Sequence, residues 1–144
     1  MEVALKGKRV LLVEDNELNR ELSKEILEKE GVIVDEAEDG DIAVEKVIQS
    51  KKRPYDFILM DIMMPRMDGY EATIQIRALD NKKLAGVPII AMTAAVTPED
   101  KLKVLEVGMN AHLSKPVAIP ELLSTIKDFL GSYQQLEGEL SKLI

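Results

Sequence analysis

The chain contains no cysteine, so it has no disulfide, no thiol nucleophile and no thiolate metal site. This absence agrees with a reducing environment, and we expect a cytoplasmic location. A membrane-spanning segment is lacking too, because the longest uncharged stretch, around 85–98, is too short and contains glycine and proline. The first residues also lack the apolar segment and small-residue cleavage site of a signal peptide. We therefore expect no association with a membrane.

Negative charge is in excess, with a formal net charge of −7 at pH 7. Such a charge argues against non-specific binding to nucleic acid or to an anionic membrane surface. The 144 residues, of which 46% are hydrophobic, suffice for one domain with one core but not comfortably for two. Composition therefore predicts a single soluble domain that does not bind nucleic acid.

Short apolar runs alternate along the chain with longer segments of helical spacing. The runs predict strands at 9–13, 32–36, 56–60, 88–92 and 111–113. The segments between them predict helices at about 17–30, 40–50, 70–79 and 97–108, with a fifth helix from 120 onwards. Five βα units in succession predict an α/β fold with a single doubly wound five-stranded parallel sheet, the flavodoxin-like architecture.

Polar side chains follow four of these predicted strands within two residues. They are Glu14 and Asp15 after the first, Asp61 after the third, Thr93 after the fourth and Lys115 after the fifth. The carboxyl ends of all strands in a parallel sheet lie along one edge, where such folds bind their ligands. We therefore expect these residues to converge there.

The chemistry of this set suits metal-assisted phosphoryl transfer. Carboxylates brought close together repel unless a cation neutralises them, and Mg²⁺ prefers such oxygen ligands. Asp61 is the candidate nucleophile, because a carboxylate can accept a phosphoryl group as an aspartyl-phosphate. Lys115 and Thr93 would then hold the phosphoryl oxygens. Each of these residues taken singly has an ordinary structural explanation. The functional interpretation therefore rests on their occurring together at the ends of several strands.

Four motifs stand in a fixed order along the chain: VEDN at 13–16, MDIMMPRMDGYEA at 60–72, AMTA at 91–94 and LSKP at 113–116. Together they resemble the receiver domain of two-component response regulators, and the similarity extends over about residues 8 to 131. The details are most similar to receivers attached to hybrid sensor histidine kinases. This resemblance implies a cytoplasmic signalling domain that takes part in a phosphorelay.

The resemblance implies a role for each motif residue. Asp61 would accept the phosphoryl group from a phosphohistidine on a histidine kinase or a histidine phosphotransfer protein. The carboxylates of Asp15 and Asp61 and the backbone carbonyl of Met63 would ligate Mg²⁺, with Glu14 acting through water. Such a domain is not an enzyme beyond its own phosphorylation and dephosphorylation.

The remaining motif residues would bind and sense the phosphoryl group. Thr93 and the Ala94 amide would hold its oxygens, and Lys115 would pair with its charge. Inward movement of Thr93 would then alter the face made by the fourth helix, the fifth strand and the fifth helix.

Two of the departures from the usual receiver pattern concern the site. His112 stands where most receivers have the Tyr or Phe that moves together with Thr93. We interpret it as a tolerated planar ring at a half-exposed strand position; the alternative is that its charge biases the switch near neutral pH. Met63 and Ala95 line the approach of water without a strong group to orient it, which predicts slow self-dephosphorylation.

The predicted receiver domain spans 1–131, and a short tail follows over 132–144. The tail has a heptad-like apolar spacing that glycines weaken, at Tyr133, Leu136, Leu140 and Leu143. We expect a helical extension or a linker, and a monomer or weak dimer. The tail is too short for a DNA-binding module, so a single-domain regulator and the terminus of a hybrid kinase both stay open.

Two other functional classes compete with a phosphorylated receiver. A metal-dependent phosphatase with an aspartate nucleophile would need a second acid two residues after Asp61, where Met63 stands. A receiver-like interaction module that never accepts phosphate is disfavoured, because the acidic, hydroxyl and lysine residues are all present.

Overall fold

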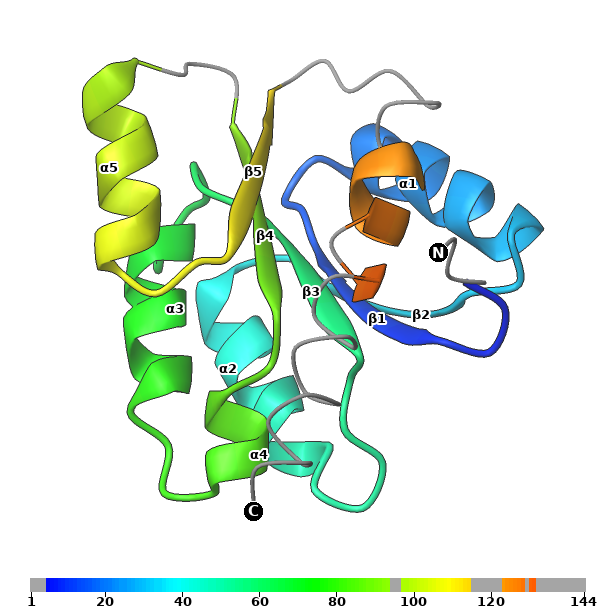
Figure 1. Ribbon diagram of the computed structural model, residues 1–144, viewed down its shortest axis with the longest axis horizontal. Coiled ribbons are helices and arrows are strands. Elements are labelled where there is room, and N and C mark those ends of the chain that lie inside the picture. The colour runs from blue at the N-terminus through cyan, green and yellow to red at the C-terminus, as the bar shows by residue number, and fades with distance from the viewer. Residues whose placement is uncertain (1–4, 94–96, 115–122, 129, 132–144) are drawn as a thin grey trace.

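The computed structural model describes residues 5–93, 97–114, 123–128 and 130–131. Its strands form one parallel sheet in the order β2-β1-β3-β4-β5 (Figure 1). They are β1 (Arg9–Val13), β2 (Ile33–Ala37), β3 (Phe57–Asp61), β4 (Ile89–Thr93) and β5 (Ala111–Ser114). This strand order is that of flavodoxin-like folds, so the predicted architecture is confirmed.

The strands end later than predicted at two functional positions. Asp61 and Thr93 are the last residues of β3 and β4 instead of the first residues after them. Their backbones still pair with neighbouring strands, Asp61 opposite Met92 and Thr93 opposite Ser114. Apolarity alone cannot show that pairing continues into a polar residue, which explains this one-residue error.

Five helices occur between the described strands. They are α1 (Glu17–Lys29), α2 (Gly40–Gln49), α3 (Gly69–Arg77), α4 (Lys82–Ala85) and α5 (Pro98–Glu106). Of these, α4 was not predicted, because a single turn is too short to show an apolar period. The predicted fifth helix corresponds to helical residues 123–128 and 130–131, and its expected start at 120 lies outside the described residues.

The sheet is buried on both faces. Along β1, alternate residues point to opposite sides, so Leu11 and Val13 pack under α2 and α3 while Val10 and Leu12 pack under α1. Ile126 and Leu130 of the C-terminal helix join the second of these clusters. Figure 1 accordingly shows α1 and the C-terminal helical turns on one side of the sheet, and α2, α3 and α5 on the other.

Polar residues cap the N-termini of these five helices. The side chain of each cap residue accepts a backbone N–H from the first turn of its own helix, an arrangement worth about 1 kcal/mol per helix. The cap residues are Asn16, Asp39, Asp68, Asn81 and Thr97. Three of them, at α1, α2 and α3, border the loops that carry the acidic residues discussed below. Within the described residues, no helix is both long and apolar enough to cross a bilayer.

Candidate functional site

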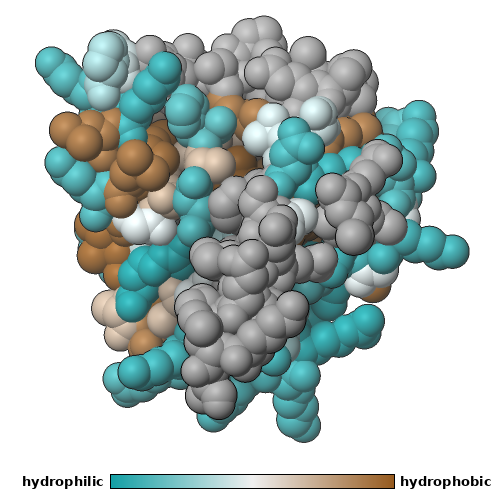
Figure 2. Space-filling view, in the orientation of Figure 1, coloured by the Kyte–Doolittle hydropathy of each residue, from teal (hydrophilic) through white to brown (hydrophobic). Residues whose placement is uncertain are grey.

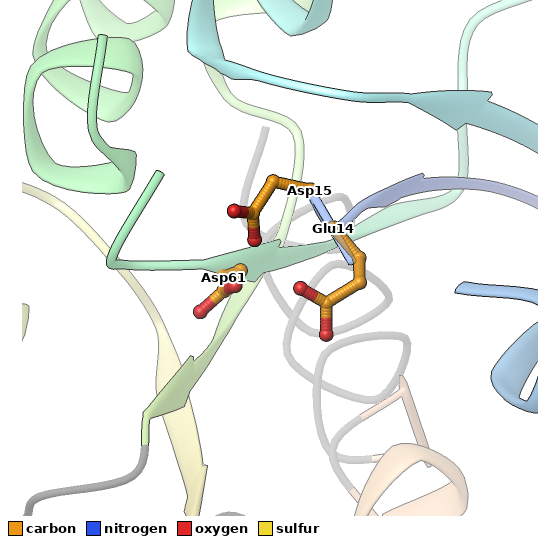
Figure 3. Close-up of side chains that lie close together, drawn as sticks. All are labelled: Glu14, Asp15 and Asp61. Carbon is orange, nitrogen blue, oxygen red and sulfur yellow. The ribbon is translucent and has the colours of Figure 1, made fainter. Parts of the chain in front are cut away.

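Three predicted site residues, Glu14, Asp15 and Asp61, meet at the carboxyl edge of the sheet. Each offers one carboxylate oxygen, and these oxygens all lie within 4.8 Å of one another (Figure 3). Glu14 and Asp61 are buried, with exposed fractions of 3% and 5%, whereas Asp15 is exposed. Like charges that are so close and so buried favour a bound cation, and carboxylate oxygens are the donors that hard divalent ions prefer. The donor set therefore fits a metal ion.

The register of the sheet explains why residues far apart in sequence meet here. Val13 of β1 lies opposite Met60 of β3. Val13 is followed by Glu14 and Met60 by Asp61, so these two side chains start from adjacent points at the edge of the sheet. Only Glu14 and Asp15 separate the end of β1 from Asn16, the N-cap of α1, which keeps both carboxylates close to the sheet.

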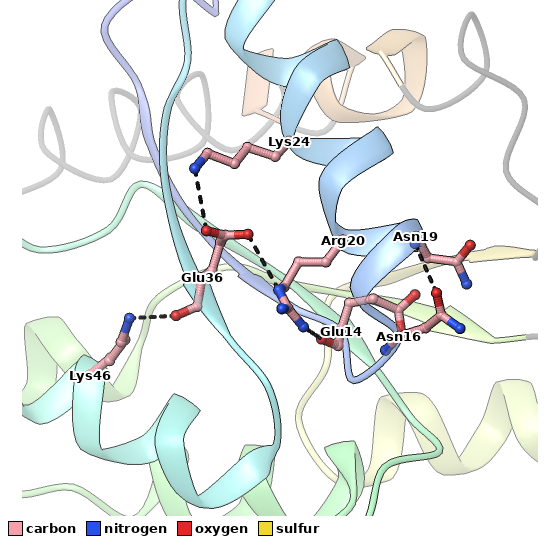
Figure 4. Close-up of polar contacts among 7 residues, drawn as sticks. All are labelled: Glu14, Asn16, Asn19, Arg20, Lys24, Glu36 and Lys46. Atoms are coloured by element: carbon pink, nitrogen blue, oxygen red, sulfur yellow. Dashed lines mark hydrogen bonds and ion pairs between the residues drawn. The ribbon is translucent and has the colours of Figure 1, made fainter.

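Arg20 of α1 anchors the β1–α1 loop. Its Nη1 donates to the carbonyl oxygen of Glu14 at 2.9 Å, and its Nε lies 3.3 Å from Oε1 of Glu36 on β2 (Figure 4). Lys24 contacts the other carboxylate oxygen of Glu36, also at 3.3 Å. The backbone that carries the first two acidic residues is thus tied to both α1 and β2.

The β3–α3 loop carries Asp61 at its start and Met63 two residues later. The N–H of Gly69 donates to the Ile62 carbonyl at 2.9 Å and closes the loop at its base. A Cβ at position 69 would lie only 2.3 Å from the carbonyl oxygen of Asp61, so this position admits only glycine. The Met63 side chain is 77% exposed, and its carbonyl is the predicted backbone ligand of the metal.

The other predicted site residues belong to β4, β5 and the loops after them. Thr93 ends β4, one residue beyond the Met92 that pairs with Asp61. The side chain of Thr93, together with Ala94 and Lys115, lies outside the described residues. His112 of β5 pairs with Ala91 of β4 and is half-buried, as expected for its strand position.

Sequence reasoning missed the residues that support the site. Arg20 follows the N-cap Asn16 by four residues, so a cation in the first turns of α1 was a usable signal. Asp39, directly before a glycine and an apolar helical pattern, was recognisable as an N-cap. Its partner Arg66 was not, because that contact joins two loops 27 residues apart.

The chain matches the family described as response regulator receiver domain over residues 10–127. Hybrid signal transduction histidine kinase B of Dictyostelium discoideum is 44% identical over 127 residues, covering 82% of this chain and 6% of that protein. Probable histidine kinase 2 of rice is 40% identical over 124 residues, covering 78% of this chain and 12% of that protein. The chain thus spans only a small part of these kinases.

A shorter relative matches over nearly its whole length. The polar-differentiation response regulator DivK of Brucella ovis is 35% identical over 124 residues, covering 86% of this chain and 97% of DivK. The match to a family over most of the chain, and to a full-length regulator, agrees with the resemblance found in the motifs.

Solved structures show the same fold. The receiver domain of a sensor histidine kinase from Pseudomonas aeruginosa superposes with a TM-score of 0.75 at 39% identity, covering 87% of this chain and 98% of that one. Its crystal structure has a magnesium ion coordinated in the active site cleft. The chemotaxis protein CheY4 of Vibrio cholerae superposes with a TM-score of 0.75 at 31% identity, covering 84% and 97%.

Proposed function

The chain belongs to the family of response regulator receiver domains, and from this premise we propose that Asp61 is its phosphoryl acceptor. Receiver domains are signalling modules of two-component systems rather than enzymes acting on a separate substrate. The observation that carries the proposal is the convergence of Glu14, Asp15 and Asp61 at one strand edge, with oxygens within 4.8 Å.

In the proposed reaction, a carboxylate oxygen of Asp61 attacks the phosphorus of a phosphohistidine. The P–N bond to the histidine breaks while a P–O bond to Asp61 forms, and the histidine leaves as the neutral imidazole after taking up a proton. Phosphoryl transfer depends mostly on positioning and charge neutralisation. The burial of Asp61 at the end of β3 supports this role, because the strand fixes the direction of attack.

We propose Mg²⁺ as the metal, held by Asp15, Asp61 and the Met63 carbonyl, with Glu14 acting through a water molecule. When bound, the ion would neutralise the carboxylates and the phosphoryl oxygens. The all-oxygen donor set supports this choice. The magnesium ion in the Pseudomonas receiver supports it by analogy.

Roles for the remaining predicted residues follow from family membership. Thr93 and the Ala94 amide would bind phosphoryl oxygens, Lys115 would pair with the phosphoryl charge, and His112 would take the place of the switching aromatic ring. The position of Thr93 at the end of β4, next to the strand of Asp61, supports its part in this set.

The phosphoryl donor would be a histidine kinase or a histidine phosphotransfer protein, which must approach the carboxyl edge to reach Asp61. Two exposed apolar side chains lie on the loops and first turn around this edge, Leu18 at 63% exposure and Met63 at 77%. They would pack against an apolar surface of the donor around its histidine. The likeness to both DivK and hybrid kinases keeps a single-domain regulator and a hybrid-kinase terminus as alternatives.

The output would pass through a second surface, formed by α5, β5 and the C-terminal helix. Figure 2 shows apolar side chains gathered over α5, on the left of the view. Leu102 and Leu105 of this helix are 59% and 62% exposed. Such exposed leucines suit a protein partner better than solvent.

We further propose a receiver domain over 1–131, a tail over 132–144, a cytoplasmic location and a monomer or weak dimer.

Membership of the receiver family leaves the Asp-nucleophile phosphatase without support. The interaction module that never accepts phosphate differs from the proposal in one measurable property, which is phosphorylation itself. Incubation with acetyl phosphate and Mg²⁺, followed by intact mass, should show a gain of about 80 Da, the mass of one phosphoryl group. The gain should disappear in Asp61→Ala and when Mg²⁺ is chelated.

A mass gain that persists in Asp61→Ala would contradict the proposed acceptor, and no gain in the unmodified protein would favour the interaction module. The decay of the adduct after removal of acetyl phosphate tests the slow self-dephosphorylation predicted from Met63 and Ala95. We expect a half-life of minutes or longer, and a half-life of seconds would show that this prediction is wrong.

A further inference from the structure

The β2–α2 loop contains a buried carboxylate that lies outside the acidic cluster. Asp39 is 1% exposed and caps α2, accepting the N–H of Ile42 at 3.0 Å. Its other carboxylate oxygen forms an ion pair with the guanidinium of Arg66, which belongs to the β3–α3 loop. A buried carboxylate is stable only when it is paired or hydrogen-bonded, so this contact satisfies Asp39 while drawing the two loops together.

Arg66 adopts an unusual backbone conformation. Its φ is +63°, and it is the one non-glycine residue with positive φ in the part of the chain that the structure describes. Residues other than glycine and asparagine rarely adopt this left-handed backbone conformation. The conformation therefore needs support from outside the loop, and the ion pair with Asp39 provides it.

A second contact lies next to the first. The N–H of Gly40 donates to the carbonyl of Met67 at 3.1 Å. A Cβ on Gly40 would lie 2.5 Å from that carbonyl oxygen, so a larger residue would push the loops apart. Two consecutive residues of the β3–α3 loop, Arg66 and Met67, thus dock on Asp39 and Gly40, the N-cap and first residue of α2.

These contacts bracket the proposed metal ligand. The loop is fixed at its base, where Gly69 donates to Ile62, and again at Arg66 and Met67. Met63 lies between these two anchors, and its own side chain is largely exposed. The position of the Met63 carbonyl relative to Asp61 therefore depends on both anchors.

We propose that Asp39, through its ion pair with Arg66, is a positioning residue that holds the Met63 carbonyl in place for the magnesium site. Asp39 touches neither the metal nor the phosphoryl group in this role. The inference rests on the proposed function, because it takes the Met63 carbonyl as a ligand.

The ionisation of Asp39 agrees with this role. Burial alone would raise the pKa of its carboxyl group, but the Ile42 N–H and the Arg66 guanidinium outweigh burial and lower the pKa below its usual value. The carboxylate is therefore charged at neutral pH, as the ion pair requires.

Two substitutions break the ion pair without removing the helix cap or straining the backbone. Asp39→Asn keeps a good N-cap side chain but loses the charge. Arg66→Gly removes the guanidinium and leaves a residue that accepts a positive φ. Glu45→Gln is the matched control, since it removes an exposed carboxylate from the same helix.

The readout is Mg²⁺ affinity measured by isothermal titration calorimetry on the unphosphorylated protein. We expect each variant to weaken binding about tenfold, as is typical when a residue that orients a metal ligand is lost. The double variant should be no weaker than either single one, because both remove the same contact. Glu45→Gln should bind as the unmodified protein does.

A further readout separates positioning from general loss of structure. In the acetyl phosphate assay, saturating Mg²⁺ should restore the phosphorylation rate of both variants, because Asp61 itself is unchanged. Mg²⁺ affinity equal to that of the unmodified protein in both variants would overturn this inference alone. Absence of Mg²⁺ binding by the unmodified protein would overturn the proposed function as well.

Discussion

The two edges of the sheet use polar residues in opposite ways. At the amino edge, polar groups are matched with partners of complementary charge. Tyr55 donates to Asp35 at 2.7 Å, and Arg9 contacts the same carboxylate oxygen at 3.1 Å while its guanidinium lies 4.9 Å from the centre of the Tyr55 ring. At the carboxyl edge, three carboxylates of the same charge gather within 4.8 Å.

Arg77 is the clearest example of matching at the amino edge. From the end of α3 it donates to the carbonyls of Ala85, Val87 and Gly108 at 2.6, 2.7 and 2.9 Å. It also donates to Oδ1 of Asn110 at 2.9 Å, an atom that accepts the N–H of Ile89 as well. One side chain thus joins the ends of α3 and α4 to the segments around β4 and β5.

The matched polar groups at the amino edge stabilise the fold, whereas the carboxylate cluster at the carboxyl edge carries the proposed function. Matched donors and acceptors lower the free energy of the folded state, whereas gathered like charges raise it unless positive charge compensates them. We therefore expect substitutions at the amino edge to reduce stability without changing Mg²⁺ binding. A substitution that removes one of the clustered carboxylates should do the reverse.

Replacement of Arg77 should give the largest loss of stability. Arg77→Met keeps much of the apolar stem but leaves the carbonyls of Ala85, Val87 and Gly108 without this donor, so we expect a loss of about 3 kcal/mol in the free energy of unfolding. Urea denaturation measures this loss, and Lys82→Ala, an exposed cation on α4, is the control with a change below about 0.5 kcal/mol. A weakened Mg²⁺ affinity in folded Arg77→Met would break the proposed division between the edges.

Addition of Mg²⁺ should have the next largest effect on the free energy of unfolding, through the carboxylates at the carboxyl edge. A ligand that binds only the folded state at about 100 times its Kd stabilises that state by about 2.7 kcal/mol. Urea denaturation with and without Mg²⁺ should show this gain in the unmodified protein and its near loss in Asp15→Asn. Without metal, Asp15→Asn should be no less stable than the unmodified protein, since it removes one of three like charges. A loss of stability there would mean that Asp15 is structural.

Tyr55→Phe should give a smaller change at the amino edge. It removes one hydrogen bond to Asp35, which should cost about 1 kcal/mol near neutral pH. A change of that size should leave Mg²⁺ affinity unaltered, and calorimetry checks this. An equal stability of the two proteins would show that the Tyr55 hydroxyl contributes nothing.

The pH dependence of this variant sharpens the same prediction. Burial and the hydrogen bond to Asp35 raise the pKa of Tyr55 well above its usual value. An unfolded tyrosine ionises near about pH 10, so its contribution to stability is present below that pH and is lost as the pH rises further. The stability of the unmodified protein relative to Tyr55→Phe should therefore decrease above that pH. A constant difference would contradict the assigned role of the hydroxyl.

Much of this fold was predictable because the physical signal is local. Buried strands such as β3 read as unbroken apolar runs, and a capped helix such as α5 begins with threonine and proline. The convergence of Glu14, Asp15 and Asp61 was predictable as well, because a parallel sheet places all strand ends on one edge.

The features that escaped prediction depend on contacts between distant segments. The positive φ of Arg66 and its ion pair with Asp39 follow from the docking of two loops, which no local pattern encodes. The single turn of α4 is fixed in part by Arg77, whose Nη1 donates to the Ala85 carbonyl. Such features become visible only once the strands are in register.

The position of the phosphoryl group tests the central claim most directly. After treatment with acetyl phosphate and Mg²⁺, borohydride reduction converts an aspartyl-phosphate to homoserine, which tandem mass spectrometry locates within a peptide. We predict a single homoserine, at position 61, whose formation requires Mg²⁺. Homoserine at position 15 instead, or none in folded protein that binds Mg²⁺, would contradict the assignment of Asp61 as the acceptor.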